Sequence, residues 1–507
     1  MQQLKSLGGA VDDVAGWVRA HDAELLAELA AWVAQPSVSS TGEGMAGAAA
    51  HGAELLRRSG LAPEVVPTGG WPTLIGTAPG PPGAPHVLVY GHYDVQPPGP
   101  LHEWASPPFT PDFRDGRVYG RGTGDNKGQH LAQLLALRAL RELTGRLPCR
   151  VTVLLDGEEE VGSPHLPAVV RQRVAADPPD LVLWSDGPVH ESGRPSVVLG
   201  VRGVLAFELR ARGASAVLHS GNWGGIAPNP AWRLVHALAT MRAPDGRVLV
   251  EGFADGVEPP SPGERAALDR LPVELSAVLA DIGASAPEPP VDRGFADRLV
   301  APTFTINSLS CEDTPEHRTV IPNVAVARCD VRLVGGQRGD RVLAALRAHL
   351  AVHAPDVELV AGATVEPSRT LPESRWTEAV LAGAAAGLGE PPVLVPALGG
   401  SLPIAAFTDG LGVPCYGLPL ANVDERNHAP NENLELRWFR RGVVAAAAVH
   451  RAIAAAGLEE ARREAAREEA ARRETPQRKA SQQGASQRDT PQHDTPQHET
   501  PPREAAQ

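Results

Sequence analysis

Five side chains of types that bind metals follow stretches typical of buried strands or tight turns. In open α/β sheets, sites form in the crevice beyond the carboxyl ends of the strands. Two imidazoles and three carboxylates exceed what one tetrahedral zinc with an open position needs, but they suit a two-metal hydrolytic centre. The five residues are His92 after Val87–Tyr90, Asp125 after a glycine-rich stretch, Glu160 after Val151–Leu155, Asp186 after Leu181–Trp184, and His428 after Val413–Leu418.

A second carboxylate stands close to the first histidine. Asp94 follows His92 by two residues, and residues two apart on an extended chain point to the same side. His92 could therefore bind a metal while Asp94 supports a neighbouring group. A buried, hydrogen-bonded histidine is the alternative interpretation of this pair.

Three consecutive acids, Glu158, Glu159 and Glu160, follow another apolar stretch. Acids gathered in this way repel one another and are costly to bury without a cation. One of them can bind a metal while the next faces the substrate as a general base. A solvated turn is the alternative, and these residues alone do not decide which glutamate has which role.

Two glycine-containing stretches could also contact a ligand. Arg121–Gly128 resembles a phosphate-binding loop but lacks the Gly-Lys-Ser/Thr ending, and Asp125 could equally cap the following helix. In a two-metal centre, Asp125 would instead bridge both ions. Gly399–Pro403 predicts a turn before a helix, whose free N–H groups could hold an anionic part of a substrate.

The order of predicted elements indicates the fold. From residue 85 to 198, strands alternate with helices, the clearest helix being Gln129–Leu143, which predicts a mostly parallel sheet flanked by helices. From about residue 203 the pattern changes, with a half-exposed strand at Val204–Arg210 and a helix at Asp340–Ala351. This change predicts an inserted α+β lid or dimerisation domain. The α/β pattern resumes near residue 372.

The predicted organisation has four segments. Residues 12–60 should be helical, 243–300 form an irregular excursion, and the sequence after Glu474 should be disordered because it has nothing to bury. The segments are 1–202 and 369–457 for the catalytic domain, 203–368 for the inserted domain, and 458–507 for a charged helix and tail.

Composition excludes several classes of function. The net charge of −13 argues against nucleic acid as a partner, because phosphate binding needs clustered Lys and Arg. We expect no signal peptide and no membrane span. The four cysteines show no paired spacing, which favours buried thiols and a cytoplasmic location.

The combined motifs resemble the M20 family of di-metal peptidases and deacylases, most closely its carnosinase-like dipeptidases. The resemblance covers roughly residues 15 to 455, and the motifs follow the family order. The matching stretches are YGHYDVQP (90–97), YGRGTGDNKG (119–128), DGEEEVGS (156–163), WSD (184–186), LHSGNWGG (218–225), RTVIPN (318–323), DVRLV (330–334), GGSLP (399–403) and NHAPNE (427–432).

The resemblance implies a role for each matching residue. It makes His92 and Asp186 ligands of one metal and Glu160 and His428 ligands of the other, with Asp125 bridging. Its E-E-x-G-S register selects Glu159 as general base and Asp94 as the residue that orients it. The implied substrate contacts are His219, which reaches into the site of the partner subunit, and Thr319, Arg332 and Ser401. Asn126 departs from the pattern, since carnosinase-like members often carry an acid there.

The resemblance also implies an activity. We expect metal-dependent hydrolysis of dipeptides or short peptides by a homodimer that holds two divalent ions, most simply zinc, with manganese or cobalt as substitutes. An N-acyl amino acid deacylase or carbamoylase of the same family is one alternative, and a catalytically inactive binding scaffold is another.

Overall fold

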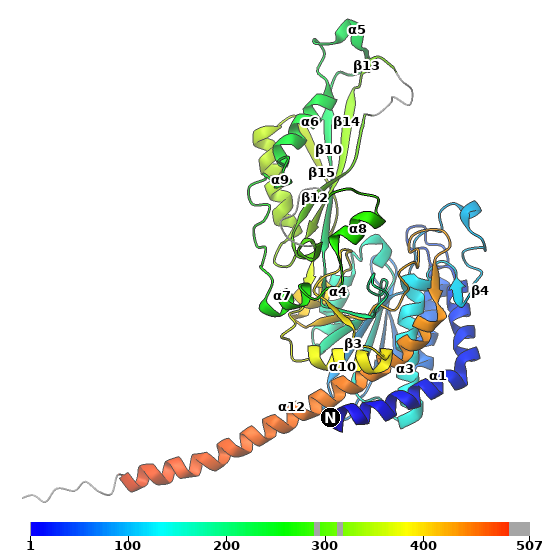
Figure 1. The fold of residues 1–507 in the computed structure, drawn as a ribbon, viewed down its shortest axis with the longest axis vertical. Coiled ribbons are helices and arrows are strands. Elements are labelled where there is room, and N and C mark those ends of the chain that lie inside the picture. The colour runs from blue at the N-terminus through cyan, green and yellow to red at the C-terminus, as the bar shows by residue number, and fades with distance from the viewer. Residues whose placement is uncertain (1, 288–294, 312–317, 486–507) are drawn as a thin grey trace, which may run out of the picture. The chain divides into compact units, whose positions relative to one another are not determined.

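A computed structural model describes residues 2–287, 295–311 and 318–485 of the 507-residue chain. The chain divides into two compact units, Met1–Ala456 and Gly457–Gln507. The first unit contains a sheet of eight strands and a sheet of four strands. Figure 1 shows these two sheets as separate groups, each with its own helices.

The larger sheet has the order β1-β2-β6-β3-β7-β18-β8-β17. Strands β6, β3, β7 and β18 form a parallel centre, and β1 and β2 are antiparallel at one edge. The predicted mixed, mostly parallel sheet is confirmed. The strands are β1 (Ala62–Val66), β2 (Thr73–Ala78), β3 (His86–His92), β6 (Arg150–Asp156), β7 (Leu181–Trp184), β8 (Ser196–Val198), β17 (Val393–Val395) and β18 (Cys415–Gly417).

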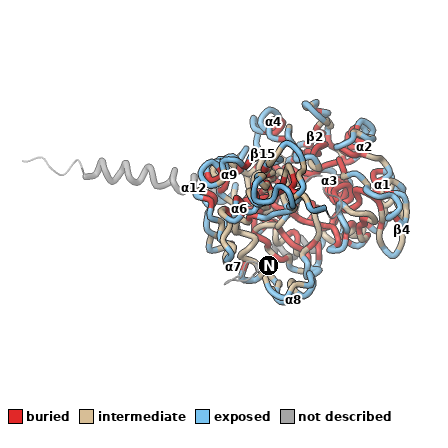
Figure 2. The backbone as a smooth tube through the Cα atoms, turned by 90° about the horizontal axis from the view of Figure 1, so that it is seen from above, coloured by how far each residue is buried: buried red, intermediate tan, exposed pale blue. Residues whose placement is uncertain are grey.

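Helices cover both faces of this sheet. Val87 and Val89 of β3 enter the core shared with α1, α2, α3, α10 and the first part of α12, whereas Leu88 and Tyr90 enter the core shared with α4 and α11. Burial on both faces explains why the central strands are almost uniformly apolar. Figure 2 shows how deeply α3 is enclosed. The helices are α1 (Gln2–Ala34), α2 (Met45–Arg58), α3 (Gly128–Thr144), α4 (Leu166–Val169), α10 (Thr377–Leu388), α11 (Ala405–Leu411) and α12 (Leu436–Ala485).

The inserted domain is an antiparallel sheet, β12-β14-β10-β15, with helices α6 and α9 packed against it. Buried and partly exposed residues alternate along β10, as predicted for a half-exposed strand. The predicted α+β insertion is confirmed, and we propose 203–368 as its limits. Its elements are β10 (Gly203–Arg212), α6 (Pro230–Met241), β12 (Thr303–Cys311), β14 (Val324–Leu333), α9 (Gly339–His353) and β15 (Val357–Val365).

Short pairings connect the rest of the first unit. The hinge between the two sheets is made by β9 and β16, and a small sheet of β4, β5 and β19 lies beside the loop that carries His428. The far end of the inserted domain carries β11, α5 and β13. Their limits are β4 (Asp112–Arg114), β5 (Arg117–Tyr119), β9 (Gly200–Val201), β11 (Leu218–His219), α5 (Ser220–Trp223), β13 (Val320–Ile321), β16 (Ser368–Arg369) and β19 (Asn433–Glu435).

Two predicted segments differ from the structure. The helical stretch expected over 12–60 is interrupted between Ala34 and Met45, because Pro36 cannot continue a helix. The excursion at 243–300 contains α7 (Pro262–Leu268), α8 (Leu275–Asp281) and the turn η5 (Phe295–Val300), while 288–294 lie outside the described residues. Ser261 and Glu264 form a capping box at the start of α7. The Ser-x-x-Glu spacing was the available signal for this helix.

Helix α12 belongs to both units. Its first part, up to Ala456, lies in the core of the first unit. Its remainder, from Gly457 to Ala485, belongs to the second unit. The predicted Glu459–Arg463 pair is present at 2.9 Å. The helix continues past Glu474 to Ala485, where disorder was predicted, and 486–507 lie outside the described residues. In the described chain, only Leu436–Arg463 has the length and hydropathy of a membrane-crossing helix, and 67% of its apolar window is buried, as in a core helix.

Candidate metal centre

Asp125 lies between two histidines that are far apart in the sequence. Its Oδ1 is 3.0 Å from Nε2 of His92, and its Oδ2 is 3.0 Å from Nε2 of His428. Nε2 of His92 also faces Oδ2 of Asp186 at 3.3 Å, and Nε2 of His428 faces Oε2 of Glu160 at 3.2 Å. The five residues thus form two triads that share Asp125.

The parallel strands explain why these residues meet. In the sheet register, His92 lies opposite Asp156, and Tyr90 lies opposite Trp184. The chain therefore leaves β3, β6 and β7 at one edge of the sheet. Glu160 follows in the single turn η3 (Glu159–Val161), which begins three residues after β6. The predicted crevice beyond the strand ends is where the side chains converge.

The second histidine comes from a loop with an unusual backbone. Arg426, His428 and Asn431 all have positive φ values, with φ 57° at His428. Such conformations are uncommon for residues other than glycine and persist where the surroundings hold them. Nδ2 of Asn431 donates to Glu103 O at 2.7 Å, and its Oδ1 accepts from Ala105 N at 2.8 Å.

Asp94 joins the first histidine to the acidic turn. Its Oδ1 and Oδ2 accept hydrogen bonds from the backbone N–H groups of Glu159 and Glu160, both at 3.1 Å. Nδ1 of His92 lies 3.1 Å from the Asp94 carbonyl and 3.3 Å from its Oδ1. A proton on Nδ1 satisfies these acceptors and leaves the lone pair of Nε2 directed at Asp125 and Asp186.

The donor set fits divalent cations. The buried Nε2 of His92 faces two carboxylates, Asp125 at 3.0 Å and Asp186 at 3.3 Å, and with the proton on Nδ1 its lone pair is free for a cation held between them. Burial and the charge of Asp125 raise the pKa of the Glu160 carboxyl to about 7, and they raise the pKa of Asp186. Nitrogen and carboxylate donors facing one another in this way suit zinc and similar ions.

Glu159 lies beside these groups and remains partly exposed. Burial raises the pKa of its carboxyl well above the usual value, and the nearby carboxylates of Asp186 and Glu160 raise it further. Its predecessor has a different environment. Glu158 is buried, with Oε2 2.7 Å from Nδ1 of His165 and Oε1 accepting from Trp71 N at 3.3 Å.

Glu432 holds the glycine-rich loop at residues 121–125. In the sequence it appears only as the last residue of the NHAPNE motif. Its buried carboxylate accepts N–H groups of Gly122, Gly124 and Asp125 at 2.9 to 3.1 Å and pairs with Arg121 at 2.6 Å. These amides are therefore already satisfied. The phosphate-loop interpretation is wrong, and the helix-cap alternative also fails because Lys127 is the N-cap residue of α3.

Two further residues hold groups of the centre: Gln96, which the sequence did not single out, and Asn126. Gln96 donates its backbone N–H to Oε1 of Glu160 at 3.1 Å and its side-chain amide to Oε2 at 3.0 Å. Asn126 is fully buried and donates to Ser185 O at 2.5 Å. An ionised carboxylate has no proton to donate to the Ser185 carbonyl. This difference gives a physical reason for Asn126 at a position where carnosinase-like members often carry an acid.

Arg332 and Ser401 meet across the boundary between the two sheets. Nη1 of Arg332, in β14, donates to Oγ of Ser401 at 3.3 Å, and its Nε is 3.3 Å from Oδ1 of Asp330. Ser401 stands in the loop between β17 and α11. The structure therefore brings together these two predicted substrate contacts.

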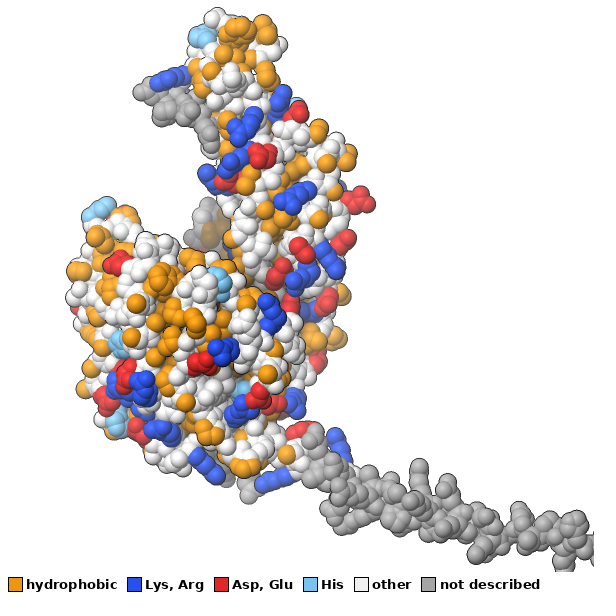
Figure 3. All heavy atoms as spheres, turned by 180° about the vertical axis from the view of Figure 1, so that it is seen from behind, with side chains coloured by type: hydrophobic (Ala, Val, Ile, Leu, Met, Phe, Trp, Pro, Cys, Tyr) orange, Lys and Arg blue, Asp and Glu red, His pale blue; other side chains and the backbone are white. Residues whose placement is uncertain are grey.

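The other two predicted contacts lie at the tip of the inserted domain. His219 is exposed, and its Nδ1 accepts the N–H of Gly221 at the start of α5. Thr319 is exposed next to it, and its carbonyl accepts from Ser220 N at 2.9 Å. Figure 1 shows α5 far from β3, so the structure does not bring these residues to the five-residue cluster. Apolar side chains gather at the same tip, where Trp223 and Ile226 are 46% and 74% exposed (Figure 3).

Known proteins are similar to this chain in sequence. A family model described as peptidase family M20/M25/M40 matches residues 88–452. The Cys-Gly metallodipeptidase dug1 of Schizosaccharomyces pombe is 29% identical over 55% of this chain and 60% of its own length. The rat (Rattus norvegicus) Beta-Ala-His dipeptidase is 28% identical over 70% of this chain and 74% of its own length.

Solved structures agree with this assignment. The M20 family metallo-carboxypeptidase Sso-CP2 from Sulfolobus solfataricus superposes with a TM-score of 0.78 at 28% identity, covering 85% of this chain and 99% of that one. Human carnosine dipeptidase 1 has the same fold, with a TM-score of 0.71 at 24% identity over 88% of this chain and 98% of that one. Because the family model spans most of the chain, this protein belongs to peptidase family M20/M25/M40.

Proposed function

We propose that this protein is a metallodipeptidase that hydrolyses dipeptides or short peptides from the end bearing a free carboxylate. The observation that carries the proposal is the placement of Asp125, one oxygen of which faces each histidine at 3.0 Å. A carboxylate held in this way can bridge two cations. The names of the curated relatives, Cys-Gly metallodipeptidase and Beta-Ala-His dipeptidase, support dipeptides as the substrate class.

The family uses divalent metals, and the proposed number here is two. His92 and Asp186 would hold one ion, Glu160 and His428 would hold the other, and Asp125 would bridge them. Zinc suits this donor set best, with manganese or cobalt as substitutes. When bound, such ions supply an acidified water and a polarised substrate carbonyl.

Glu159 is the proposed general base. It lies beside both triads, has no ligand role in this proposal, and is partly exposed. It would accept a proton from the attacking water and deliver it to the leaving amine. Asp94 holds the backbone on which Glu159 stands and so sets the position of its carboxylate.

Arg332 and Ser401 form the proposed subsite for the substrate carboxylate. A guanidinium offers donors that match a carboxylate, and the Ser401 hydroxyl can add another. Because Arg332 comes from the inserted domain and Ser401 from the catalytic domain, a substrate bound here would contact both domains.

A homodimer is the proposed assembly. His219 stands at the exposed tip of the inserted domain, away from the centre of its own subunit. A partner subunit could receive His219 and Thr319 in its site, where an imidazole would stabilise the developing oxyanion. The exposed Trp223 and Ile226 at the same tip fit a surface that is covered in a dimer. The four free cysteines support a cytoplasmic location.

A reconstitution experiment tests the proposal. The metal-free protein is assayed against a panel of unblocked dipeptides and N-acetyl amino acids, before and after addition of zinc, manganese or cobalt. We expect metal-dependent hydrolysis of dipeptides with two ions bound per subunit. Hydrolysis confined to the N-acetyl amino acids would replace dipeptidase with deacylase, and metal binding without turnover of any amide would indicate a binding scaffold.

A further inference from the structure

Arg202 lies at the hinge between the two sheets, directly between β9 and β10. Its backbone N–H donates to Leu398 O at 3.2 Å. Its side chain continues the same attachment, because both Nε and Nη2 donate to the carbonyl of Gly399, at 3.2 and 3.1 Å. One arginine therefore ties the hinge to the loop that carries Ser401.

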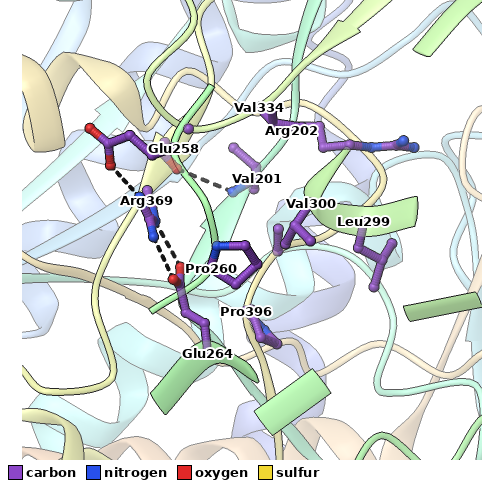
Figure 4. Close-up of a pocket in the computed structure, with 13 residues that line it drawn as sticks. Val201, Arg202, Glu258, Pro260, Glu264, Leu299, Val300, Val334, Arg369 and Pro396 are labelled. Carbon is purple, nitrogen blue, oxygen red and sulfur yellow. Dashed lines mark hydrogen bonds and ion pairs between the residues drawn. The ribbon is translucent and has the colours of Figure 1, made fainter. Parts of the chain in front are cut away.

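No carboxylate pairs with Arg202 among the residues that the structure describes. Two acids that line the same cavity as Arg202 are already paired, because Arg369 binds both Glu258 and Glu264. Figure 4 shows that the Arg202 side chain points away from this ion-pair cluster. A small cavity lies between them, lined by Arg202, Glu258, Glu264 and Arg369 among others. The positive charge of Arg202 is thus not neutralised by a paired acid, and it lies beside the 399–401 loop.

A second guanidinium stands nearby. Burial lowers the pKa of Arg202, and the positive charge of Arg332 lowers it further. Asp330 is the one acid that opposes this effect, and it is itself paired with Arg332 at 3.3 Å. Two arginines with one neighbouring carboxylate leave an excess positive charge beside the 399–401 loop. A partly buried site with such an excess attracts an anion.

We propose that Arg202 is a positioning and specificity-determining residue of the carboxylate subsite. Through the Gly399 carbonyl it holds the loop so that Ser401 faces Arg332, and its unpaired charge supplements that of Arg332. The ligand class is a peptide with a free terminal carboxylate, in preference to the same peptide with a neutral end. The inference rests on the proposed function, since it concerns the substrate of that same site.

The test compares one dipeptide with its carboxy-terminal amide. In Arg202→Gln, we expect KM for the free dipeptide to rise about tenfold or more while KM for the amide changes less than about threefold, because the lost interaction is with a charged group. Arg202→Lys keeps the charge and one donor, so it should retain most of the preference. Arg338→Gln is the matched control: Arg338 also links the inserted domain to α11, through Asp409 at 3.0 Å, but has no contact with Gly399 or Ser401.

The outcomes separate this inference from the proposed function. Equal changes in KM for the dipeptide and its amide in Arg202→Gln would overturn the role of Arg202. The same conclusion would follow if Arg202→Lys lost as much of the preference for the free dipeptide as Arg202→Gln. A selectivity loss of the same size in Arg338→Gln would also overturn it, because the effect would then belong to the hinge in general. Failure of the unmodified protein to hydrolyse any dipeptide would instead count against the proposed function.

Discussion

The carboxylate of Asp94 accepts a hydrogen bond from the backbone N–H of Glu159 at 3.1 Å, although the two residues are 65 positions apart. The proposed general base is therefore positioned through its main chain, while its side chain stays free to move a proton. The other oxygen of Asp94 takes the N–H of Glu160. One buried carboxylate thus aligns the proposed base and a proposed metal ligand together.

Replacing Asp94 should damage turnover more than metal binding. In Asp94→Asn, an amide nitrogen replaces one of the two carboxylate oxygens and faces a backbone N–H group. The turn that carries Glu159 and Glu160 should therefore shift. We expect kcat to fall by about 100-fold, as small misplacements of catalytic groups do, with most of the metal retained. Steady-state kinetics and metal analysis check this. Asp340→Asn, at an exposed position on α9, should leave both measurements unchanged.

The three consecutive glutamates should differ sharply in their effects. Glu159→Gln removes the proton acceptor and is expected to lower kcat by about 100-fold to 10,000-fold with the metals still bound. Glu158→Gln keeps one acceptor for Trp71 N and should retain more than about a tenth of the activity. Near-normal activity in Glu159→Gln would reject its assignment as the base.

Glu432 should be needed for stability. In Glu432→Gln, the buried Arg121 loses its ionic partner, and breaking such a pair costs about 3 to 5 kcal/mol. The free energy of unfolding, measured with urea on the metal-loaded protein, should fall accordingly. Glu435→Gln removes a more exposed pair with Arg117 and should cost about 1 kcal/mol or less. Equal losses in the two variants would contradict the role given to Glu432.

In the metal-free protein, the contribution of the metal-centre residues to stability should fall as pH rises from 5 to 8. The pKa of Glu160 is raised from 4.5 to about 7, so its stabilising contribution is present below 4.5 and is lost as pH rises through 7. The pKa of His428 is raised from 6.5 to about 11 by its bonds to Asp125 and Glu160, so its contribution declines above 6.5. The pKa of Asp125 is lowered from 3.8, so its contribution stays constant over this range.

Bound cations should reverse this trend, because metal binding displaces protons from the same groups. Melting temperatures of chelator-treated and zinc-saturated protein, compared at pH 5, 6, 7 and 8, should therefore diverge as pH rises. A metal-free protein that becomes more stable relative to the zinc form over this range would contradict the shared use of these residues.

Mixing two inactive variants tests the role of His219 in the partner's site. In a mixed dimer of Glu159→Gln and His219→Ala subunits, one site has both an intact Glu159 and an intact His219 from its partner. After subunit exchange, the mixture should recover about one quarter of the original activity, since half of the dimers are mixed and one site in each is complete. No recovery in a mixture shown to contain mixed dimers would indicate that His219 acts within its own subunit, and full activity of His219→Ala alone would indicate that it has no role.

The sequence alone determined the kinds of chemistry and the order of the elements. Apolar strands followed by His92, Glu160 and Asp186 predicted the edge of a parallel sheet as the site, because side-chain type and strand pattern are local properties. The resemblance selected Glu159 from three equivalent glutamates. The helical stretch at 12–60 and the excursion at 243–300 were predicted less well, because Pro36 and the cap at Ser261 act within a few residues and are easily hidden by the surrounding composition.

Only the tertiary structure decided how these groups are held. Asp125 faces His428 across 303 positions, and Glu432 reaches back to the amides of the 121–125 loop. No spacing in the sequence encodes such contacts, since they depend on where the folded sheet brings distant loops. The same holds for Arg202, whose free charge is apparent only once Arg369 is seen to occupy Glu258 and Glu264. Local pattern specifies which groups are present, and packing specifies which of them are left unpaired to bind a ligand.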